Sequence, residues 1–133
     1  MVREDNPFQT WVASKGIEIR ASGVLGAGRG AFALAALPPN TIIGLYRGET
    51  LTPEQYDAKY PHGALASFVL QTGLRRFIDA SNEAQANWTR YINDCRGSGL
   101  SNNVEFTVRG GVRTKRRIRA GEELLVDYGP EYF

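Results

Sequence analysis

A glycine-rich segment in the first quarter of the chain is the clearest sign of ligand binding. Residues Gly26-Ala27-Gly28-Arg29-Gly30-Ala31 contain the pattern G-x-G-x-x-A. Glycines at this spacing allow a tight turn whose backbone can approach a ligand closely. Dinucleotide-binding folds use the same pattern, and Glu49 follows about twenty residues later, where those folds carry an acidic residue. The segment is therefore a plain turn, a dinucleotide site, or a backbone cradle for another nucleotide-like cofactor.

The surroundings of this segment argue against the dinucleotide site. That site needs a buried strand before the glycines and a long helix after them. Here Pro38-Pro39 end the apolar stretch 31–37, and no alternation of strands and helices follows. A nicotinamide-dependent enzyme is thus the least favoured of the alternatives.

The basic residues are unevenly distributed. The formal net charge is only +2, yet six of the eleven residues from Arg109 to Arg119 are Arg or Lys. Arginines that alternate on a hairpin usually form a solvated face, and they can also contact nucleic-acid phosphates. Few aromatic residues lie among them, so a base-stacking platform is not supported. No apolar run is long enough to span a membrane, and neither a membrane partner nor an oligomeric state is indicated.

The elements that must position these residues are short. The chain has 133 residues with 42% hydrophobic and 23% charged residues, which fits one globular domain. The single Cys95 excludes an internal disulfide and a cysteine-only zinc site. Alternation and β-branched residues predict strands over 17–20, 41–46, 68–70, 76–78, 104–108, 113–118 and 123–128. Two short helices are predicted, one over 53–59 with Thr52 as N-cap and one over 81–91.

Four short sequence motifs, which we call landmarks, follow one another along the chain in an informative order. They are Gly28-Arg29-Gly30, Tyr46-Arg47-Gly48, Arg90-Tyr91-Ile92-Asn93 and Glu123-Leu124-Leu125-Val126-Asp127-Tyr128-Gly129. Together they resemble the SET domain of protein lysine methyltransferases, with matching features from about residue 17 to 129. The run Asn87-Trp88-Thr89-Arg90-Tyr91-Ile92-Asn93 is most similar to the PR subgroup of that family.

The resemblance implies a fold and a function. The fold is the mainly β (α+β) SET-domain β-clip of several small sheets, with short helices and a C-terminal pseudoknot. It would occupy residues 17–133, after an N-terminal arm at 1–16. The implied activity is methyl transfer from S-adenosylmethionine to a protein lysine, with a histone tail as the natural substrate and an intracellular, nuclear location.

The same resemblance implies the site residues, with no metal among them. The catalytic residues would be Tyr128, which orients the lysine amine, and Tyr46. The cofactor would be bound by Ala27, Gly28, Arg29, Gly30, Asn93, Asp94 and Tyr128. The channel for the target lysine would be lined by Tyr46, Phe106, Val126 and Tyr128.

The implied chemistry is physically reasonable. A lysine amine must be neutral to attack, although its free pKa is about 10.4. Burial in an apolar channel beside a sulfonium cation lowers that pKa by desolvation and charge repulsion. The amine must also lie in line with the methyl–sulfur bond, so positioning supplies much of the rate.

Three departures from the family pattern are visible, and the first and last of them keep an alternative open. Asp94 stands where the family usually has His, the familiar Pro-Asn is replaced by a late Asn102-Asn103, and cysteine-rich flanking segments are missing. The alternative is a catalytically weak SET-like module that binds a peptide or nucleic acid. Phe106 and Val126 stand where tyrosines can limit methyl number, which predicts room for di- or trimethylation.

Overall fold

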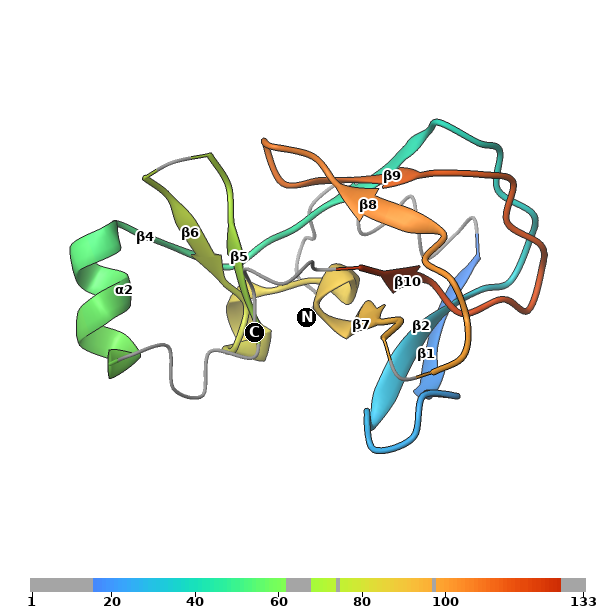
Figure 1. The fold of residues 1–133 in the computed structure, drawn as a ribbon, viewed down its shortest axis with the longest axis horizontal. Coiled ribbons are helices and arrows are strands. Elements are labelled where there is room, and N and C mark those ends of the chain that lie inside the picture. Colours follow the sequence, from blue (N-terminus) through green and yellow to red (C-terminus); the bar gives the residue numbers. More distant parts are fainter. Residues whose placement is uncertain (1–15, 62–67, 74, 97, 128–133) are drawn as a thin grey trace.

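The computed structural model describes residues 16–61, 68–73, 75–96 and 98–127, and this part of the chain folds into four small sheets with one α-helix (Figure 1). The predicted mainly β architecture of several small sheets is confirmed. The proposed arm at 1–16, except Gly16, and the proposed catalytic Tyr128 lie outside the described residues. Within the described residues, no helix combines the length and apolar character that crossing a bilayer requires.

The first sheet carries the glycine segment at its end. Strands β1 (Ile17–Ala21) and β2 (Arg29–Ala33) pair antiparallel. The turn between them is closed by the Ser22 N–H, which donates to the Gly28 carbonyl oxygen at 2.8 Å. Ala31 and Ala33 are fully buried, so β2 lies in the core while the turn projects from it.

The second sheet has the order β3-β9-β8, from strands β3 (Ile42–Leu45), β9 (Gly111–Thr114) and β8 (Val104–Phe106). The hairpin of β8 and β9 is confirmed, but its second strand is 111–114 and not the predicted 113–118. β9 begins earlier than predicted because the loop after β8 is tight. The Gly111 N–H donates to Thr107 Oγ1 at 2.9 Å, so strand pairing resumes at Gly111. The chain then leaves the sheet, and buried Ile118 bridges to Leu37.

The third sheet lies at the other end of the molecule, beside the α-helix (Figure 1). Its order is β4-β6-β5, from strands β4 (Glu49–Leu51), β6 (Phe77–Asp79) and β5 (Val69–Gln71). Helix α2 (Pro53–Lys59) confirms the predicted helix, and Thr52 and Gln55 form a reciprocal capping box at its start.

The second predicted helix, over 81–91, is wrong. The segment forms two 3₁₀ helices, η2 (Glu83–Gln85) and η3 (Trp88–Tyr91), separated by Ala86 in extended conformation. The side-chain oxygens of Asn82 and Asn87 accept hydrogen bonds from the N–H groups of Ala84 and Thr89 at 3.0 Å. Each asparagine therefore starts a new short turn, which prevents one continuous helix.

The last sheet joins distant parts of the chain. Strand β10 (Leu125–Val126) pairs in parallel with β7 (Asn93–Asp94). The predicted strand over 123–128 is thus shorter within the described residues, because Glu123 makes an isolated bridge to Phe32 instead. The main core below these strands contains Ala31, Ala33, Leu37, Ile43, Trp88, Ile92, Val104, Val112, Ile118, Leu124 and Val126.

Candidate functional site

The Asn93 side chain joins two of the sequence landmarks. Its amide Nδ2 donates to the Arg29 carbonyl oxygen at 2.9 Å and to Glu123 Oε2 at 3.3 Å. Asn93 is the first residue of β7 and Arg29 is the first residue of β2. The two residues are 64 positions apart in the sequence and meet through this hydrogen bond. The structure brings the predicted Arg29, Gly30 and Asn93 together.

Glu123 lies at the centre of this meeting point, although the sequence analysis did not select it. Its carboxylate accepts hydrogen bonds from the Ser22 hydroxyl at 2.7 Å and the Gly23 N–H at 3.0 Å. It is also only 9% exposed. The available signal was a charged residue at the start of the apolar run 124–126.

Gly30 is required by this carboxylate. A Cβ on Gly30 would overlap Glu123 Oε2 and lie 2.9 Å from its Cδ, closer than real Cβ atoms come. Glycine at this position lets the glutamate approach the backbone of β2 and hold the turn from below.

The tip of the turn is open. Gly26 and Gly28 have φ values of +80° and +77°, and no atom lies within 4 Å of the position that a Cβ would take on either. Ala27 is half-buried and Arg29 is exposed, with its guanidinium 5.9 Å from the centre of the Tyr91 ring. The turn thus presents backbone to incoming groups, which suits a ligand held by main-chain contacts.

The C-terminal strand passes between two segments of the chain. On one side, the Cys95 N–H donates to the Val126 carbonyl oxygen at 2.8 Å. On the other side, the buried Asn103 side chain donates to the Glu123 carbonyl oxygen at 2.8 Å and accepts from the Leu125 N–H at 2.9 Å. Asn103 therefore fixes the strand that leads toward residue 128, in the crossing arrangement expected of the pseudoknot.

The residues that follow Asn93 have other partners. The Asp94 carboxylate accepts from the Arg96 N–H at 2.7 Å and from Arg96 Nε at 3.3 Å. Cys95 is buried, and burial together with the nearby carboxylates of Asp94 and Asp127 raises the pKa of its thiol. Cys95 is therefore a buried thiol and not an activated nucleophile.

Tyr46 and Phe106 form the second group of predicted site residues. The Tyr46 hydroxyl donates to the Phe68 carbonyl oxygen at 2.8 Å, and its ring meets the Phe106 ring edge-on, with centroids 5.4 Å apart. Val126 is 2% exposed in the main core, against which Phe106 packs. Phe106 thus packs both against Tyr46 and against the main core that contains Val126.

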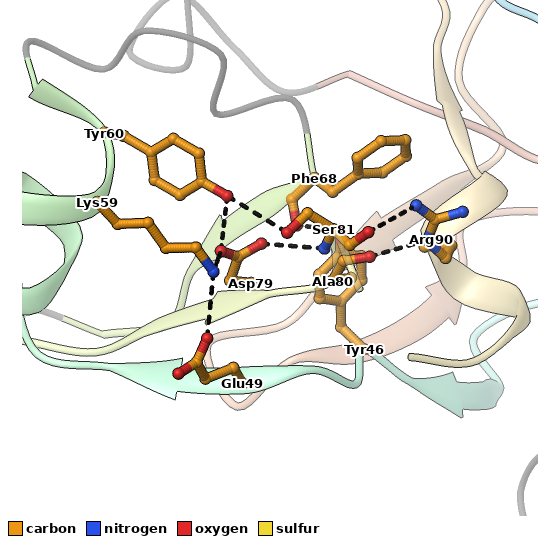
Figure 2. A network of polar contacts seen from close by, with 9 residues as sticks. All are labelled: Tyr46, Glu49, Lys59, Tyr60, Phe68, Asp79, Ala80, Ser81 and Arg90. Atoms are coloured by element: carbon orange, nitrogen blue, oxygen red, sulfur yellow. Dashed lines mark hydrogen bonds and ion pairs between the residues drawn. The ribbon is translucent and has the colours of Figure 1, made fainter. Parts of the chain in front are cut away.

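Arg90 lies beside Phe68, Ala80 and Ser81, next to the residue that binds the Tyr46 hydroxyl (Figure 2). Its Nε donates to the Ala80 carbonyl oxygen at 2.8 Å, and its NH2 group donates to the Ser81 carbonyl oxygen at 3.3 Å. The guanidinium also lies 4.1 Å from the centre of the Phe68 ring. Arg90 therefore fixes the residue whose carbonyl receives the Tyr46 hydroxyl.

A buried carboxylate ties helix α2 to the same sheet (Figure 2). Asp79 Oδ2 lies 2.7 Å from Lys59 Nζ and accepts from the Tyr60 hydroxyl at 2.7 Å, while Oδ1 accepts from the Ser81 N–H at 3.0 Å. Burial by itself would raise the pKa of Asp79, but these hydrogen bonds outweigh it and lower the pKa to about 2. Asp79 is therefore ionised at neutral pH and links β6 to the end of α2.

Comparison with known proteins agrees with this arrangement. The family model described as "SET domain" matches residues 28–129, from the glycine turn through the crossing strand. The chain belongs to the SET-domain family. This membership replaces the dinucleotide interpretation, because the glycines belong to a SET domain.

Two similar proteins are both named histone-lysine N-methyltransferases. Histone-lysine N-methyltransferase set-17 of Caenorhabditis elegans is 32% identical over 117 residues, covering 86% of this chain and 41% of that protein. Histone-lysine N-methyltransferase PRDM7 of Homo sapiens is 34% identical over 122 residues, covering 88% of this chain and 24% of that protein. The SET domain described here thus spans less than half the length of either relative.

Proposed function

We propose that this SET domain is a protein-lysine N-methyltransferase that uses S-adenosylmethionine. The observation that carries the proposal is the hydrogen bond from the Asn93 amide to the Arg29 carbonyl oxygen. It joins the open glycine turn to the crossing of β7 and β10, and β10 ends two residues before Tyr128 in the sequence. The turn and the Asn93 side chain would then share one site with the candidate catalytic tyrosine.

The cofactor half of the site would be formed by the turn and the residues next to it. Gly28, Arg29 and Gly30 would contact S-adenosylmethionine through their backbone, with Ala27, Asn93, Asp94 and Tyr128 around them. The open backbone at Gly26 and Gly28 fits such contacts. When bound, the cofactor supplies a methyl group activated by its positive sulfur.

The lysine half of the site would be formed by Tyr46, Phe106, Val126 and Tyr128. The aromatic and apolar walls exclude water, which lowers the pKa of an entering lysine amine and favours its neutral form. The Tyr46 hydroxyl is held by the Phe68 carbonyl, so its ring can act as a fixed wall. Tyr128 would orient the amine through its hydroxyl.

The substrate follows from the relatives. Both are named histone-lysine methyltransferases, so a histone tail is the proposed substrate and the nucleus the proposed location. Phe106 and Val126, at positions where tyrosines can limit the number of methyl groups, would leave room in the channel for di- or trimethylation.

Calorimetric titration with S-adenosylhomocysteine, with NADH as control, tests the cofactor half. Binding of S-adenosylhomocysteine alone is expected. Mass spectrometry of histone peptides incubated with S-adenosylmethionine then tests transfer and counts the methyl groups.

The variant Tyr128→Phe separates the two halves. It is expected to lose transfer while it keeps S-adenosylhomocysteine binding. Tyr56→Phe is the matched control, since Tyr56 stacks on Phe77 beside helix α2 and should leave both unchanged. Cofactor binding without transfer by the unaltered chain would refute the enzymatic proposal and favour a weak peptide-binding module.

A further inference from the structure

The segment 115–122, between β9 and β10, forms a charged surface that the methyl-transfer proposal does not use. We call it the basic loop. Its exposed cationic side chains are Lys115, Arg116, Arg117 and Arg119. Their backbone is held firmly, because Ile118 between them is fully buried and exchanges hydrogen bonds of 2.9 and 3.0 Å with Leu37.

The start of the basic loop is fixed as well. The Lys115 N–H donates to the Asn103 carbonyl oxygen at 2.9 Å, which ties the loop to the residue that holds β10. The cations therefore project from a rigid backbone and need little ordering when a partner binds.

Glu122 organises one cation and leaves the others available. Its carboxylate accepts from the Arg119 N–H at 2.7 Å and pairs with both terminal nitrogens of Arg116 at 3.2 Å. The hydrogen bond from Arg116 keeps the pKa of Glu122 below its usual value, so the pair is neutral overall. Among the described residues, no carboxylate pairs with Lys115, Arg117 or Arg119.

The arginines also border a hollow. An open depression of about 520 Å³ is lined by Arg116, Arg117, Arg119 and Glu122. Guanidinium groups present planar pairs of N–H donors that match phosphate oxygens. An open, cationic depression suits an extended anion that passes across it better than an enclosed small ligand.

We propose that the basic loop binds the phosphate backbone of double-stranded DNA. A peptide partner would need aromatic or aliphatic contacts for much of its binding energy, and apart from Ala120 and Gly121 every exposed residue of the loop is charged. A single-stranded nucleic acid would need aromatic rings for stacking, and residues 115–122 contain none. A surface that is positively charged but lacks aromatic rings and apolar pockets is typical of proteins that contact the phosphate backbone of a duplex.

The test is fluorescence anisotropy of a labelled duplex of about 20 base pairs over a range of salt concentrations. The loop variant carries Arg117→Gln with Arg119→Gln. It removes two phosphate contacts, so the slope of log affinity against log salt should become shallower by about 1.8. The matched control carries Arg75→Gln with Arg76→Gln, which makes the same charge change at exposed residues just before β6.

The control is expected to keep most of the slope, and both variants should keep the thermal stability of the unaltered chain. Equal losses in the two variants would overturn the proposal, because net charge would then explain binding. Absence of salt-dependent binding by the unaltered chain would also overturn it. Equal affinity for polyglutamate would overturn it in favour of an acidic polypeptide partner. None of these outcomes depends on S-adenosylhomocysteine binding, so the methyl-transfer proposal is judged separately.

Discussion

Asp79→Asn should make the stability of this domain less sensitive to acid. The Asp79 side chain is fully buried, and its ordinary pKa of 3.8 is lowered to about 2 in the folded protein. A carboxyl group with a lowered folded pKa stabilises the protein above its unfolded pKa and loses that effect as pH falls through the folded pKa. The contribution is therefore complete at pH 5 and above, and it disappears between about pH 4 and pH 2.

The magnitude follows from the two pKa values. At 1.36 kcal/mol per pH unit, the full contribution of Asp79 is about 2 kcal/mol. About 1 kcal/mol of it is lost by pH 3 and about 2 kcal/mol by pH 2. The asparagine variant has no such dependence. Between pH 5 and pH 3, its free energy of unfolding should therefore fall by about 1 kcal/mol less than that of the unaltered chain.

Urea unfolding at several pH values, followed by tryptophan fluorescence, to which buried Trp88 contributes, measures this difference. Asp57→Asn is the matched control, because Asp57 is exposed on helix α2, the helix that carries the Asp79 partner Lys59. It should change stability by less than about 0.5 kcal/mol at any pH. If the unaltered chain and Asp79→Asn show parallel pH profiles, the Lys59–Asp79–Tyr60 network does not control the ionisation of Asp79 and the reasoning fails.

Three further substitutions probe the site. Gly30→Ala should displace the Glu123 carboxylate, weaken S-adenosylhomocysteine binding by at least about tenfold and cost about 2 kcal/mol of stability, because three hydrogen bonds end on that carboxylate. Calorimetry and urea unfolding measure the two effects. The control Gly73→Ala, at φ +72° with open space around it, should lose only about 1 kcal/mol of stability and no affinity for S-adenosylhomocysteine. If Gly30→Ala binds S-adenosylhomocysteine as tightly as the unaltered chain, the role of Gly30 is contradicted. Phe106→Tyr should lower the number of methyl groups transferred, because a hydroxyl is added beside Tyr46, and an unchanged methyl distribution by mass spectrometry would count against Phe106 as a channel residue. Arg90→Lys should reduce kcat/KM on the order of tenfold with unchanged cofactor affinity, since lysine lacks the planar guanidinium that contacts the Ala80 and Ser81 carbonyls and the Phe68 ring together. Steady-state kinetics showing no loss would mean that Tyr46 is positioned without Arg90.

Local elements were predictable where local interactions decide them. The helix over 53–59 was predicted because Thr52, Pro53 and an acidic first turn are neighbours in sequence, and the capping box forms within four residues. The helix over 81–91 failed because Asn82 and Asn87 compete for backbone N–H groups, which hydrophobic periodicity does not reveal. The strand over 113–118 failed because a Thr107–Gly111 hydrogen bond closes the loop early and pairing starts at Gly111, and because Ile118 bridges to Leu37 instead of extending the hairpin.

The sequence by itself determined the family, since the four landmarks occur in order within a short chain. It also determined the mainly β fold class and the segments that carry the candidate site. Only the tertiary structure decided that Glu123 lies under the glycine turn, that Asn103 holds the crossing strand, and that Arg90 and Phe68 support Tyr46. The physical reason is that these contacts join residues 20 to 100 positions apart. Hydrogen bonds across such separations depend on how the sheets pack, and no local pattern of residues specifies them.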